Sequence, residues 1–360
     1  MGGINYYVDQ LMRRLPSGTV TIFSSRYKGW EAFDREYPHE VIRLDTEMML
    51  PTPWVRRRLH AELRSRKPDV VVFGATWPLG HMGPAIKKKL DIPYLGFTHG
   101  LELTGALVPG LLRPIGRHAG MLTAASEWSR KKLEHAFGWE DRHMPMLPSG
   151  IDTERFHPGV SDAFVRERHA LGDSPVICCV SRLVPRKGQD LLIRALPGIA
   201  RRVPDVKLLI VGIGPYEASL RKLAARTGVA DRVVFAGGVS YEELAAYFRA
   251  GDVFAMPCRL RWFGFDVEAL GAVFLQAAAV GRPVIAGDSG GAPEAVIHGK
   301  TGLVVDPTRI GPITEAITTL LLDTDRAEAM GKAGAEWMHT EWTWDHMANR
   351  LKSLLEQAVR

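Results

Sequence analysis

Residues 257–294 read PCRLRWFGFDVEALGAVFLQAAAVGRPVIAGDSGGAPE. This pattern predicts a loop with two acids, an apolar helix that opens at Gly271 and runs to 280, a short strand and a second glycine-rich loop. Glu268 lies just before the predicted helix, whose free N–H groups and dipole favour an anion such as a phosphate. Glu268 either accepts hydrogen bonds from sugar hydroxyls beside that anion or caps the helix, and the spacing alone leaves both interpretations open.

The rest of the chain repeats the alternation of short apolar runs with amphipathic segments, which is typical of parallel sheets covered by helices. A chain of 360 residues is long enough for two such domains, and turn residues between 148 and 158 mark the best boundary. We therefore predict an α/β protein with two Rossmann-like, doubly wound domains that face a cleft. The predicted parts are an N-terminal domain 1–157, a C-terminal domain 158–340 and a C-terminal helix 341–360.

The segment 180–188, VSRLVPRKG, is the second informative motif. It leaves a predicted strand, turns at Pro185 and enters a helix at Gly188, so Arg182 and Lys187 would flank one anion at the positive end of that helix. Two cations can stabilise a bound diphosphate without a metal ion. In isolation, two cations in a loop are usually only solvated.

In this order, the motifs resemble glycosyltransferase family 4, whose members are retaining enzymes of the GT-B fold. The family pattern has two glutamates separated by seven residues, then a PVI-type strand and a GG-x-PE loop. In this chain Glu268 is followed after seven residues by Gln276, then by PVI at 283–285 and GGAPE at 290–294. The FDVEALG wording at 265–271 is similar to the mannosyltransferases that build phosphatidylinositol mannosides. The resemblance covers nearly the whole chain.

The resemblance implies a role for each matching residue. Arg182 and Lys187 would bind the diphosphate, and Glu268 would orient the donor sugar. His99, in the motif GFTHG at 96–100, would contact a hydroxyl of that sugar rather than act as a base. These four are the predicted catalytic residues. The further positions expected to contact the donor are Gly2, Gly3, Gly212, Gly238, Gly271 and Gln276, and Asn5 is the candidate for acceptor contact.

The implied reaction moves a hexose, mannose from GDP-mannose, to an anionic glycolipid such as a phosphatidylinositol mannoside. The acceptor hydroxyl would attack from the face that the diphosphate leaves, with a donor phosphate oxygen taking its proton, so neither a metal nor another cofactor is expected. The second family acid usually accepts hydrogen bonds from ribose hydroxyls. Gln276 loses the charge-assisted part of those bonds, about 1 kcal/mol, which predicts weaker donor binding.

The start of the chain departs from the family pattern. In the family, a strand precedes the glycine pair Gly2–Gly3 and supplies the centre of the first sheet, whereas this sequence goes directly from Met1 into that pair. A parallel sheet without its central strand would leave unpaired backbone groups. We expect either that the true start lies upstream or that the first domain is incomplete. The family also places the C-terminal helix back on this domain.

Residues 54–67, WVRRRLHAELRSRK, predict a basic amphipathic helix. Its basic residues would face an anionic membrane surface with Trp54 as an anchor, or the helix is an ordinary surface helix. The residues in the predicted membrane contact are Trp54, Arg56, Arg57, Arg58, Arg64, Arg66 and Lys67. Because the resembled enzymes use lipid acceptors, we favour a cytoplasmic protein bound peripherally to the inner face of the membrane.

Other features narrow the choice of function. The sequence has no apolar run of membrane-spanning length, and its three cysteines lack metal-binding spacing. The sequence DTD at 323–325 predicts a helix cap rather than a metal site, and Ser126 predicts another cap. VGIGP at 211–215 fails the dinucleotide fingerprint, and no nucleic-acid motif accompanies the net charge of +6. Two alternatives remain: a non-catalytic chain that binds a glycolipid or a protein, and a nucleotide-sugar epimerase.

Overall fold

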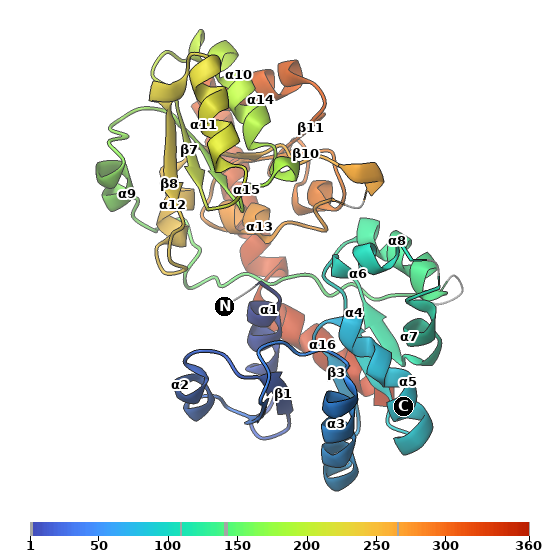
Figure 1. Ribbon diagram of the computed structural model, residues 1–360. Helices are drawn as coiled ribbons and strands as arrows, with labels where there is room; N and C mark the ends of the chain where they lie inside the picture. The colour runs from blue at the N-terminus through green and yellow to red at the C-terminus, as the bar shows by residue number, and fades with distance from the viewer. Residues whose placement is uncertain (1–2, 109, 140–142, 265, 360) are drawn as a thin grey trace. The chain divides into compact units, whose positions relative to one another are not determined.

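The computed structural model describes residues 3–108, 110–139, 143–264 and 266–359. The chain forms two compact units (Figure 1). Ile151–Thr343 make up the C-terminal unit, and Met1–Gly150 together with Trp344–Arg360 make up the N-terminal unit. The chain crosses between them at 150/151 and 343/344, whereas the predicted boundaries are 157/158 and 340/341. The C-terminal helix therefore belongs to the same unit as the start of the chain.

In the described residues of the C-terminal unit, six strands form one parallel sheet in the order β11-β10-β9-β6-β7-β8. The strands are β6 (Val176–Val180), β7 (Lys207–Val211), β8 (Val233–Gly237), β9 (Val253–Met256), β10 (Val284–Gly287) and β11 (Gly302–Val305). β6 and β9 are buried over their whole length. They are continuous apolar runs because helices cover both faces of a parallel sheet.

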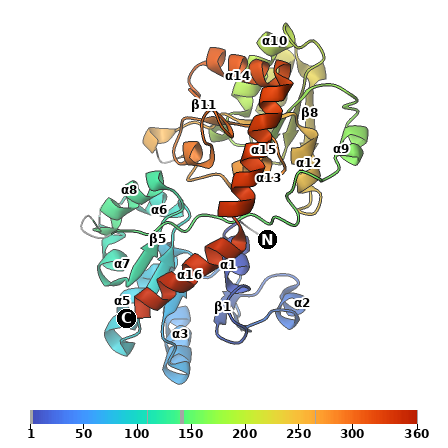
Figure 2. The ribbon, with the colours of Figure 1, turned by 180° about the vertical axis from the view of Figure 1, so that it is seen from behind.

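The helices of this unit form two layers around the sheet (Figures 1 and 2). One layer contains α10 (Gln189–Ala200), α11 (Glu217–Arg226) and α14 (Ile310–Leu322), and the other contains α12 (Leu244–Ala250), α13 (Ala272–Ala279) and α15 (Thr324–Glu341), while α9 (Ala163–Arg168) lies before β6. Asp323 caps α15 by accepting a hydrogen bond from Arg326 N at 3.1 Å, which confirms the predicted cap.

The chain changes direction between β6 and β9. It runs outward from β6 through β7 to β8 and then returns to β9, on the other side of β6. At such a switch point the loops that follow the two neighbouring strands separate, and ligands of doubly wound sheets bind there, beyond the carboxyl ends of the strands. The fold therefore predicts the position of a site before any side chain is considered.

The described residues of the N-terminal unit contain two separate parallel sheets, β1-β2 and β3-β4-β5, where the sequence predicted one sheet without its first strand. The strands are β1 (Thr21–Ser25), β2 (Glu40–Leu44), β3 (Val71–Phe73), β4 (Tyr94–Phe97) and β5 (Met121–Thr123). The helices are α1 (Gly3–Met12), α2 (Trp30–Arg35), α3 (Pro53–Arg66), α4 (Thr76–Leu79), α5 (Gly83–Leu90), α6 (Leu101–Gly105), α7 (Arg113–His118), α8 (Glu127–Phe137) and α16 (Trp344–Val359).

Helices α1 and α16 pack against each other within this unit (Figure 2). The Trp344 ring lies edge-on to Tyr6 and Tyr7, with centroid distances of 5.9 and 5.8 Å. Tyr7 also donates a hydrogen bond to Leu147 O at 2.7 Å. The two ends of the chain are thus joined through one aromatic cluster, which positions the start of α1.

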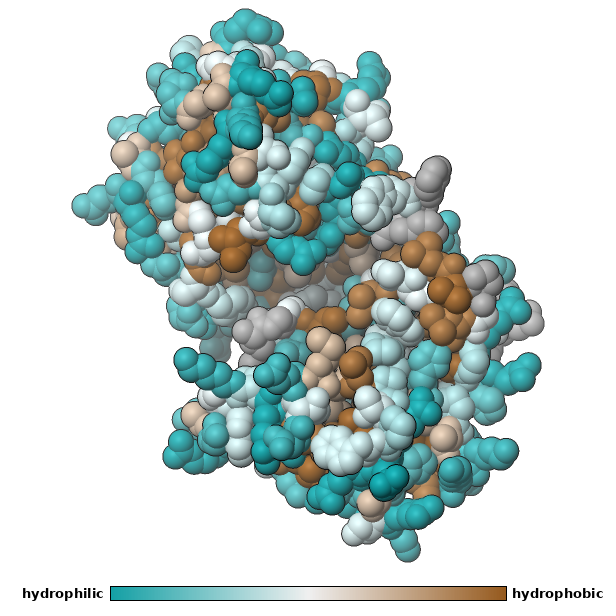
Figure 3. Space-filling view, viewed as in Figure 1, coloured by the Kyte–Doolittle hydropathy of each residue, from teal (hydrophilic) through white to brown (hydrophobic). Residues whose placement is uncertain are grey.

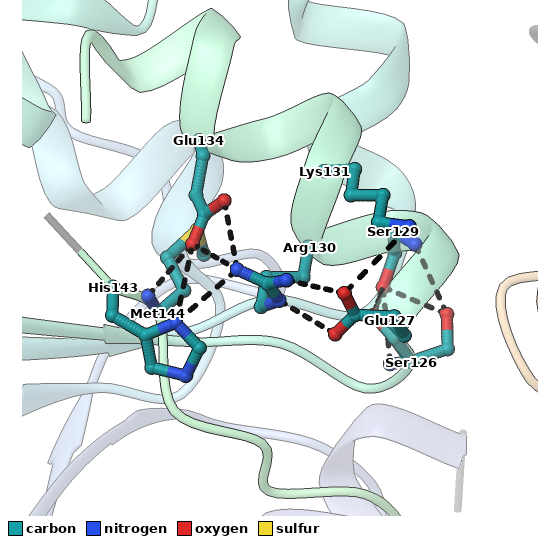
Figure 4. Close-up of polar contacts among 8 residues, drawn as sticks. All are labelled: Ser126, Glu127, Ser129, Arg130, Lys131, Glu134, His143 and Met144. Carbon is teal, nitrogen blue, oxygen red and sulfur yellow. Dashed lines mark hydrogen bonds and ion pairs between the residues drawn. The ribbon is translucent and has the colours of Figure 1, made fainter. Parts of the chain in front are cut away.

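The start of α8 is a polar cluster with a structural role (Figure 4). Ser126 caps the helix as predicted, and its side chain and that of Ser129 form a reciprocal capping box. Arg130 pairs with Glu127 and, at 2.8 Å, with Glu134. Capping boxes satisfy the free N–H groups of a first turn, so the sequence signal here is one of helix stability.

Candidate active site

The loops that carry the predicted donor residues follow successive strands of the C-terminal sheet. Arg182 and Lys187 follow β6, Gly212 follows β7, Glu268 lies after β9, and Gly290 follows β10. Because these strands are parallel, the loops lie at one edge of the sheet, on both sides of the switch point between β6 and β9. Residues far apart in the sequence are thus brought to a single edge.

Lys187 forms a short ion pair with Glu268, and the two side chains are only 10% and 13% exposed. Arg186 Nε lies 3.9 Å from the same oxygen, Glu268 Oε2, and Arg186 donates a hydrogen bond to Asp266 at 3.1 Å. The N-cap of α13 is Gly271, without a side-chain cap, so the interpretation of Glu268 as a helix cap is wrong. Glu268 is instead paired with Lys187 and lies near a second cation, Arg186.

Glycines allow the surrounding loops to approach this pair. Gly188 has φ +79°, and a Cβ there would lie 2.2 Å from Pro257 O. Gly290 has φ +63°, and its Cβ would lie 2.2 Å from Glu268 O. Gly291 N donates a hydrogen bond to that same carbonyl at 3.0 Å. The GGAPE loop therefore fixes the backbone of Glu268, which gives the family motif a physical reason in this chain.

A hollow of about 400 Å³ lies beside Arg182. Its other lining residues are Val180, Ser181, Val211, Gly212, Ile213, Gly238, Val239 and Leu244. Arg182 is exposed, and in the described part of the chain its guanidinium forms no hydrogen bond or ion pair with another side chain. A pocket lined by main chain and apolar groups, with one unpaired cation, can hold a flat ring and bind a neighbouring anion.

Helix α13 supplies two further predicted positions. Gly271, at φ +90°, opens the helix, and a Cβ there would lie 2.7 Å from the Phe274 ring. The first-turn N–H groups of α13 carry the positive end of the helix dipole. Gln276 is half-buried on the same helix, and among the described residues its amide has no hydrogen-bond partner. Its oxygen is therefore available to accept one bond from a ligand.

His99 lies in the N-terminal unit, just after β4. Its Nε2 is 2.7 Å from Gly74 O, and because a carbonyl only accepts, Nε2 must carry the proton. Burial lowers the pKa of His99, so the ring is neutral near pH 7. Nδ1 is then an acceptor. This protonation state suits contact with a hydroxyl group and does not suit proton donation.

The remaining predicted contacts of this unit are partly described. Gly2 lies outside the described residues. Gly3 is the first residue of α1, and a Cβ there would meet nothing within 4 Å. Asn5 is exposed on the same helix. In the described chain the Asn5 side chain has no hydrogen-bond partner, so it is accessible to a ligand.

Helix α3 presents the predicted basic surface. Val55, Leu59 and Leu63 are buried, whereas Trp54 is 48% exposed. All of Arg56, Arg57, Arg58, Arg64, Arg66 and Lys67 are exposed. Glu40 of β2 accepts two hydrogen bonds from Arg66, at 2.6 and 2.7 Å, and Glu62 pairs with Arg58 at 3.0 Å. Arg58 and Arg66 are therefore less available to a partner than the other basic residues of α3.

The pKa of His60 reports the charge of this surface. Burial is the largest cause that lowers the pKa of His60, and the positive charges of Lys89 of α5 and of Arg64 and Arg56 of α3 lower it further. Lys89 of α5 thus adds to the positive potential of α3. No helix in the described residues is both long and apolar enough to cross a bilayer. The face shown in Figure 3 is mostly hydrophilic, with scattered hydrophobic patches.

Sequence reasoning gave no role to Asp266, and of Glu102 it expected only that this residue faces the cleft beside His99. Asp266 holds Arg186 beside Glu268, and its position two residues before Glu268 was the available signal. Glu102 is fully buried and accepts hydrogen bonds from two loops, which no sequence pattern indicates.

Within the described ranges no group of three His, Cys, Asp or Glu could hold a metal ion. Burial raises the pKa of Cys258 to about 12, so this thiol stays protonated.

Two α/β units, with loops rich in cations at the carboxyl edge of the second sheet, are the architecture of the GT-B fold. Solved structures support the fold. HepE (Alr3699) of Anabaena, in complex with UDP, has a TM-score of 0.83 at 20% identity, covering 99% of this chain and 96% of its own. Sucrose-phosphate synthase of Thermosynechococcus elongatus has a TM-score of 0.80 at 25% identity, covering 99% and 93%.

Sequence comparison narrows this class. Residues 161–337 match the family "Glycosyl transferases group 1", and residues 1–155 match "Glycosyltransferase Family 4". The GDP-mannose-dependent alpha-(1-6)-phosphatidylinositol monomannoside mannosyltransferase of Mycobacterium tuberculosis is 44% identical over 98% of this chain and 94% of its own. The monoacylated-substrate counterpart of Corynebacterium glutamicum is 40% identical, over 100% and 96%. The chain belongs to glycosyltransferase family 4, together with these mannosyltransferases.

Proposed function

We propose that the protein transfers mannose from GDP-mannose to a phosphatidylinositol mannoside, with retention of configuration at the anomeric carbon. Identities of 44% and 40% to enzymes named for this donor and this type of acceptor, over nearly the full length, support the choice of substrates. The observation that carries the proposal is the buried Lys187–Glu268 pair at the switch point of the C-terminal sheet. It supplies a cation for the diphosphate and an acid for the sugar in one place.

In the proposed reaction, the bond between the anomeric carbon and the diphosphate oxygen breaks, and the acceptor hydroxyl oxygen bonds to that carbon on the same face. The acceptor proton passes to an oxygen of the leaving diphosphate, which departs as GDP. Lys187, Arg182 and the first turn of α13 stabilise the negative charge that develops on this leaving group. No protein nucleophile takes part.

Glu268 accepts hydrogen bonds from the mannose hydroxyls, and His99 accepts another through Nδ1. For Glu268 to do so, its bond with Lys187 must be shared with the ligand when the donor binds. Arg186 Nε, 3.9 Å from Glu268 Oε2, continues to compensate part of the negative charge of Glu268 when the donor binds. The donor guanine and ribose occupy the hollow beside Arg182, where Gly212 and Gly238 leave main-chain groups accessible.

We further propose that catalysis needs no metal ion. The leaving diphosphate is anionic, and two side-chain cations with a helix dipole can balance its charge. Arg182 has no competing acid among the described residues, and Lys187 would share its ion pair with Glu268 when the diphosphate binds.

We propose that α3 binds the cytoplasmic face of an anionic membrane, where the lipid acceptor resides. The exposed Trp54 beside Arg56 and Arg57 supports this arrangement, since indole rings favour the membrane interface and each basic side chain near the surface contributes about 1 kcal/mol. Co-sedimentation with anionic and neutral vesicles tests it. The double variant Arg56→Glu/Arg57→Glu should lose binding to anionic vesicles.

A matched control changes the same charge elsewhere. Lys222 and Arg226 are exposed on α11 and have no acidic partner in the described residues. The double variant Lys222→Glu/Arg226→Glu should sediment with anionic vesicles as the wild type does. Equal loss of binding in both double variants would mean that net charge, and not the α3 surface, determines association.

The reaction itself is tested by GDP release from GDP-mannose, with and without a phosphatidylinositol mannoside acceptor, and by the anomeric configuration of the product. We expect release only when both substrates are present, and a retained α-linkage. Calorimetry that shows no binding of GDP or GDP-mannose would favour a non-catalytic chain. A new nucleotide sugar formed without any acceptor would indicate an epimerase.

A further inference from the structure

Glu102 is a buried carboxyl group that the proposed reaction does not use. It lies on α6 at 0% exposure. Its Oε2 accepts a hydrogen bond from His99 N at 2.9 Å, and its Oε1 accepts one from Trp77 N at 3.3 Å. His99 follows β4 and Trp77 follows β3, so a single carboxyl group joins the loops at the ends of two neighbouring strands.

The surroundings of Glu102 explain how an acid can remain buried there. Burial raises its pKa, and the backbone N–H groups of His99, Glu102, Trp77 and Gly100 act in the opposite direction. In the described part of the chain no cation pairs with it. Backbone dipoles therefore provide the compensation that a salt bridge usually provides, and removing the carboxyl would leave two N–H donors unsatisfied.

The loops that Glu102 joins are the ones that hold His99. The His99 ring donates from Nε2 to Gly74 O at 2.7 Å, and Gly74 directly follows β3. The same ring packs edge-on against Tyr7, with centroids 4.9 Å apart. The orientation of the imidazole thus depends on the distance between the β3 and β4 loops, and Glu102 fixes that distance through its two hydrogen bonds.

We infer that Glu102 is a positioning residue, which holds the β3 and β4 loops so that His99 keeps its proton on Nε2 and presents Nδ1 as an acceptor to a hydroxyl of the donor sugar. The identity of that sugar contact rests on the proposed function, whereas the effect of Glu102 on the His99 ring does not. Because Nδ1 can then only accept a hydrogen bond, the sugar hydroxyl that it contacts must be the donor.

The test compares Glu102→Ala, Glu102→Gln and the control Tyr94→Phe. Tyr94 lies in β4 as well, and its buried hydroxyl donates to Ile115 O at 2.5 Å, so its loss weakens the same unit without touching the His99 loop. We expect kcat to fall about a hundredfold in Glu102→Ala, because a displacement of about 1 Å at a reacting group can cost that much. Glu102→Gln, which keeps one acceptor oxygen, should lose less, and Tyr94→Phe should keep the wild-type kcat.

A spectroscopic measurement separates positioning from simple stability. In nitrogen-15 NMR spectra of the full chain, with the His99 signals assigned by comparison with His99→Asn, the wild type should show a protonated Nε2 and an unprotonated Nδ1. In Glu102→Ala these signals should shift towards a mixture of both tautomers. GDP affinity, which the proposed function assigns mainly to Arg182, Lys187 and the hollow of the C-terminal unit, should not change.

Unchanged His99 signals and an unchanged kcat in Glu102→Ala would overturn the inference, and Glu102 would then be a purely structural residue like Tyr94. If the wild type transfers no mannose, the proposed function fails, but the nitrogen signals still decide whether Glu102 controls the His99 tautomer. If Glu102→Ala does not fold, the milder variant Glu102→Gln should show a smaller shift of the His99 nitrogen signals in the same direction. No shift in Glu102→Gln would then contradict the inference.

Discussion

The Lys187–Glu268 pair predicts a specific pattern of coupled losses. Breaking a buried ion pair by removing one partner costs about 3–5 kcal/mol of stability, since the other charge stays buried. Here both side chains retain some exposure, and Arg186 Nε at 3.9 Å from Glu268 offers a substitute partner. We therefore expect Lys187→Met to cost less, about 2 kcal/mol, and Glu268→Gln, which leaves the ammonium without its acid, about 3 kcal/mol.

The double variant Lys187→Met/Glu268→Gln should cost no more than Glu268→Gln alone, which corresponds to a coupling energy of about 2 kcal/mol. Hydrogen exchange of the β6 and β9 amides measures the local stability of the sheet that carries the pair. GDP release should fall about a hundredfold or more in each single variant, the usual effect of removing one electrostatic contact to a leaving group. Costs that simply add, with a coupling below about 0.5 kcal/mol, would refute the reasoning.

Four further outcomes follow from other parts of the structure. Gln276→Glu should lower the donor KM about fivefold, because a charge-assisted bond adds about 1 kcal/mol, and an unchanged KM would remove Gln276 from the donor site. Gly290→Ala should destabilise the C-terminal unit by about 2 kcal/mol or more, since the added Cβ would lie 2.2 Å from Glu268 O at φ +63°. The control Gly311→Ala, where a Cβ meets open space, should be neutral. Equal urea midpoints for the two variants would contradict this prediction. Burial lowers the pKa of His99, so the unfolded chain takes up the proton first, and stability should fall as the pH drops below about 6.5. The dependence of the urea midpoint on pH should be weaker in His99→Asn. GDP release should be unchanged by EDTA, and a loss that Mg²⁺ restores would show that the two cations do not suffice.

The sequence was a good guide wherever a feature depends on local pattern. The fully buried runs of β6 and β9 indicated a parallel sheet because both faces of such strands are covered. The motif around Lys187 and the stretch around Glu268 each follow a strand, so their meeting at one edge of the sheet was predictable from connectivity.

Features that depend on contacts between distant segments could not be predicted. The spacing left open whether Glu268 caps a helix or accepts hydrogen bonds from a sugar, and no pattern indicated its ion pair with Lys187. The bonds from Arg66 to Glu40 cross from a helix to a strand, and no spacing rule connects those positions. Glu102 is the clearest case, because glutamates are rarely fully buried and its place after the His99–Gly100 pair suggested only a position at the cleft, whereas the packing of α6 buries it.

The most direct test of the account is the affinity for GDP, measured by calorimetry, of the wild type, Arg182→Ala and Lys187→Ala, with Lys222→Ala on α11 as the control for lost charge. Hydrogen bonds to charged groups contribute about 1.5–3 kcal/mol, so each of the two site variants should bind GDP at least about tenfold more weakly, while the control binds as the wild type does. If both site variants bind GDP as tightly as the wild type, the diphosphate is not held by these cations and the proposed donor site is wrong.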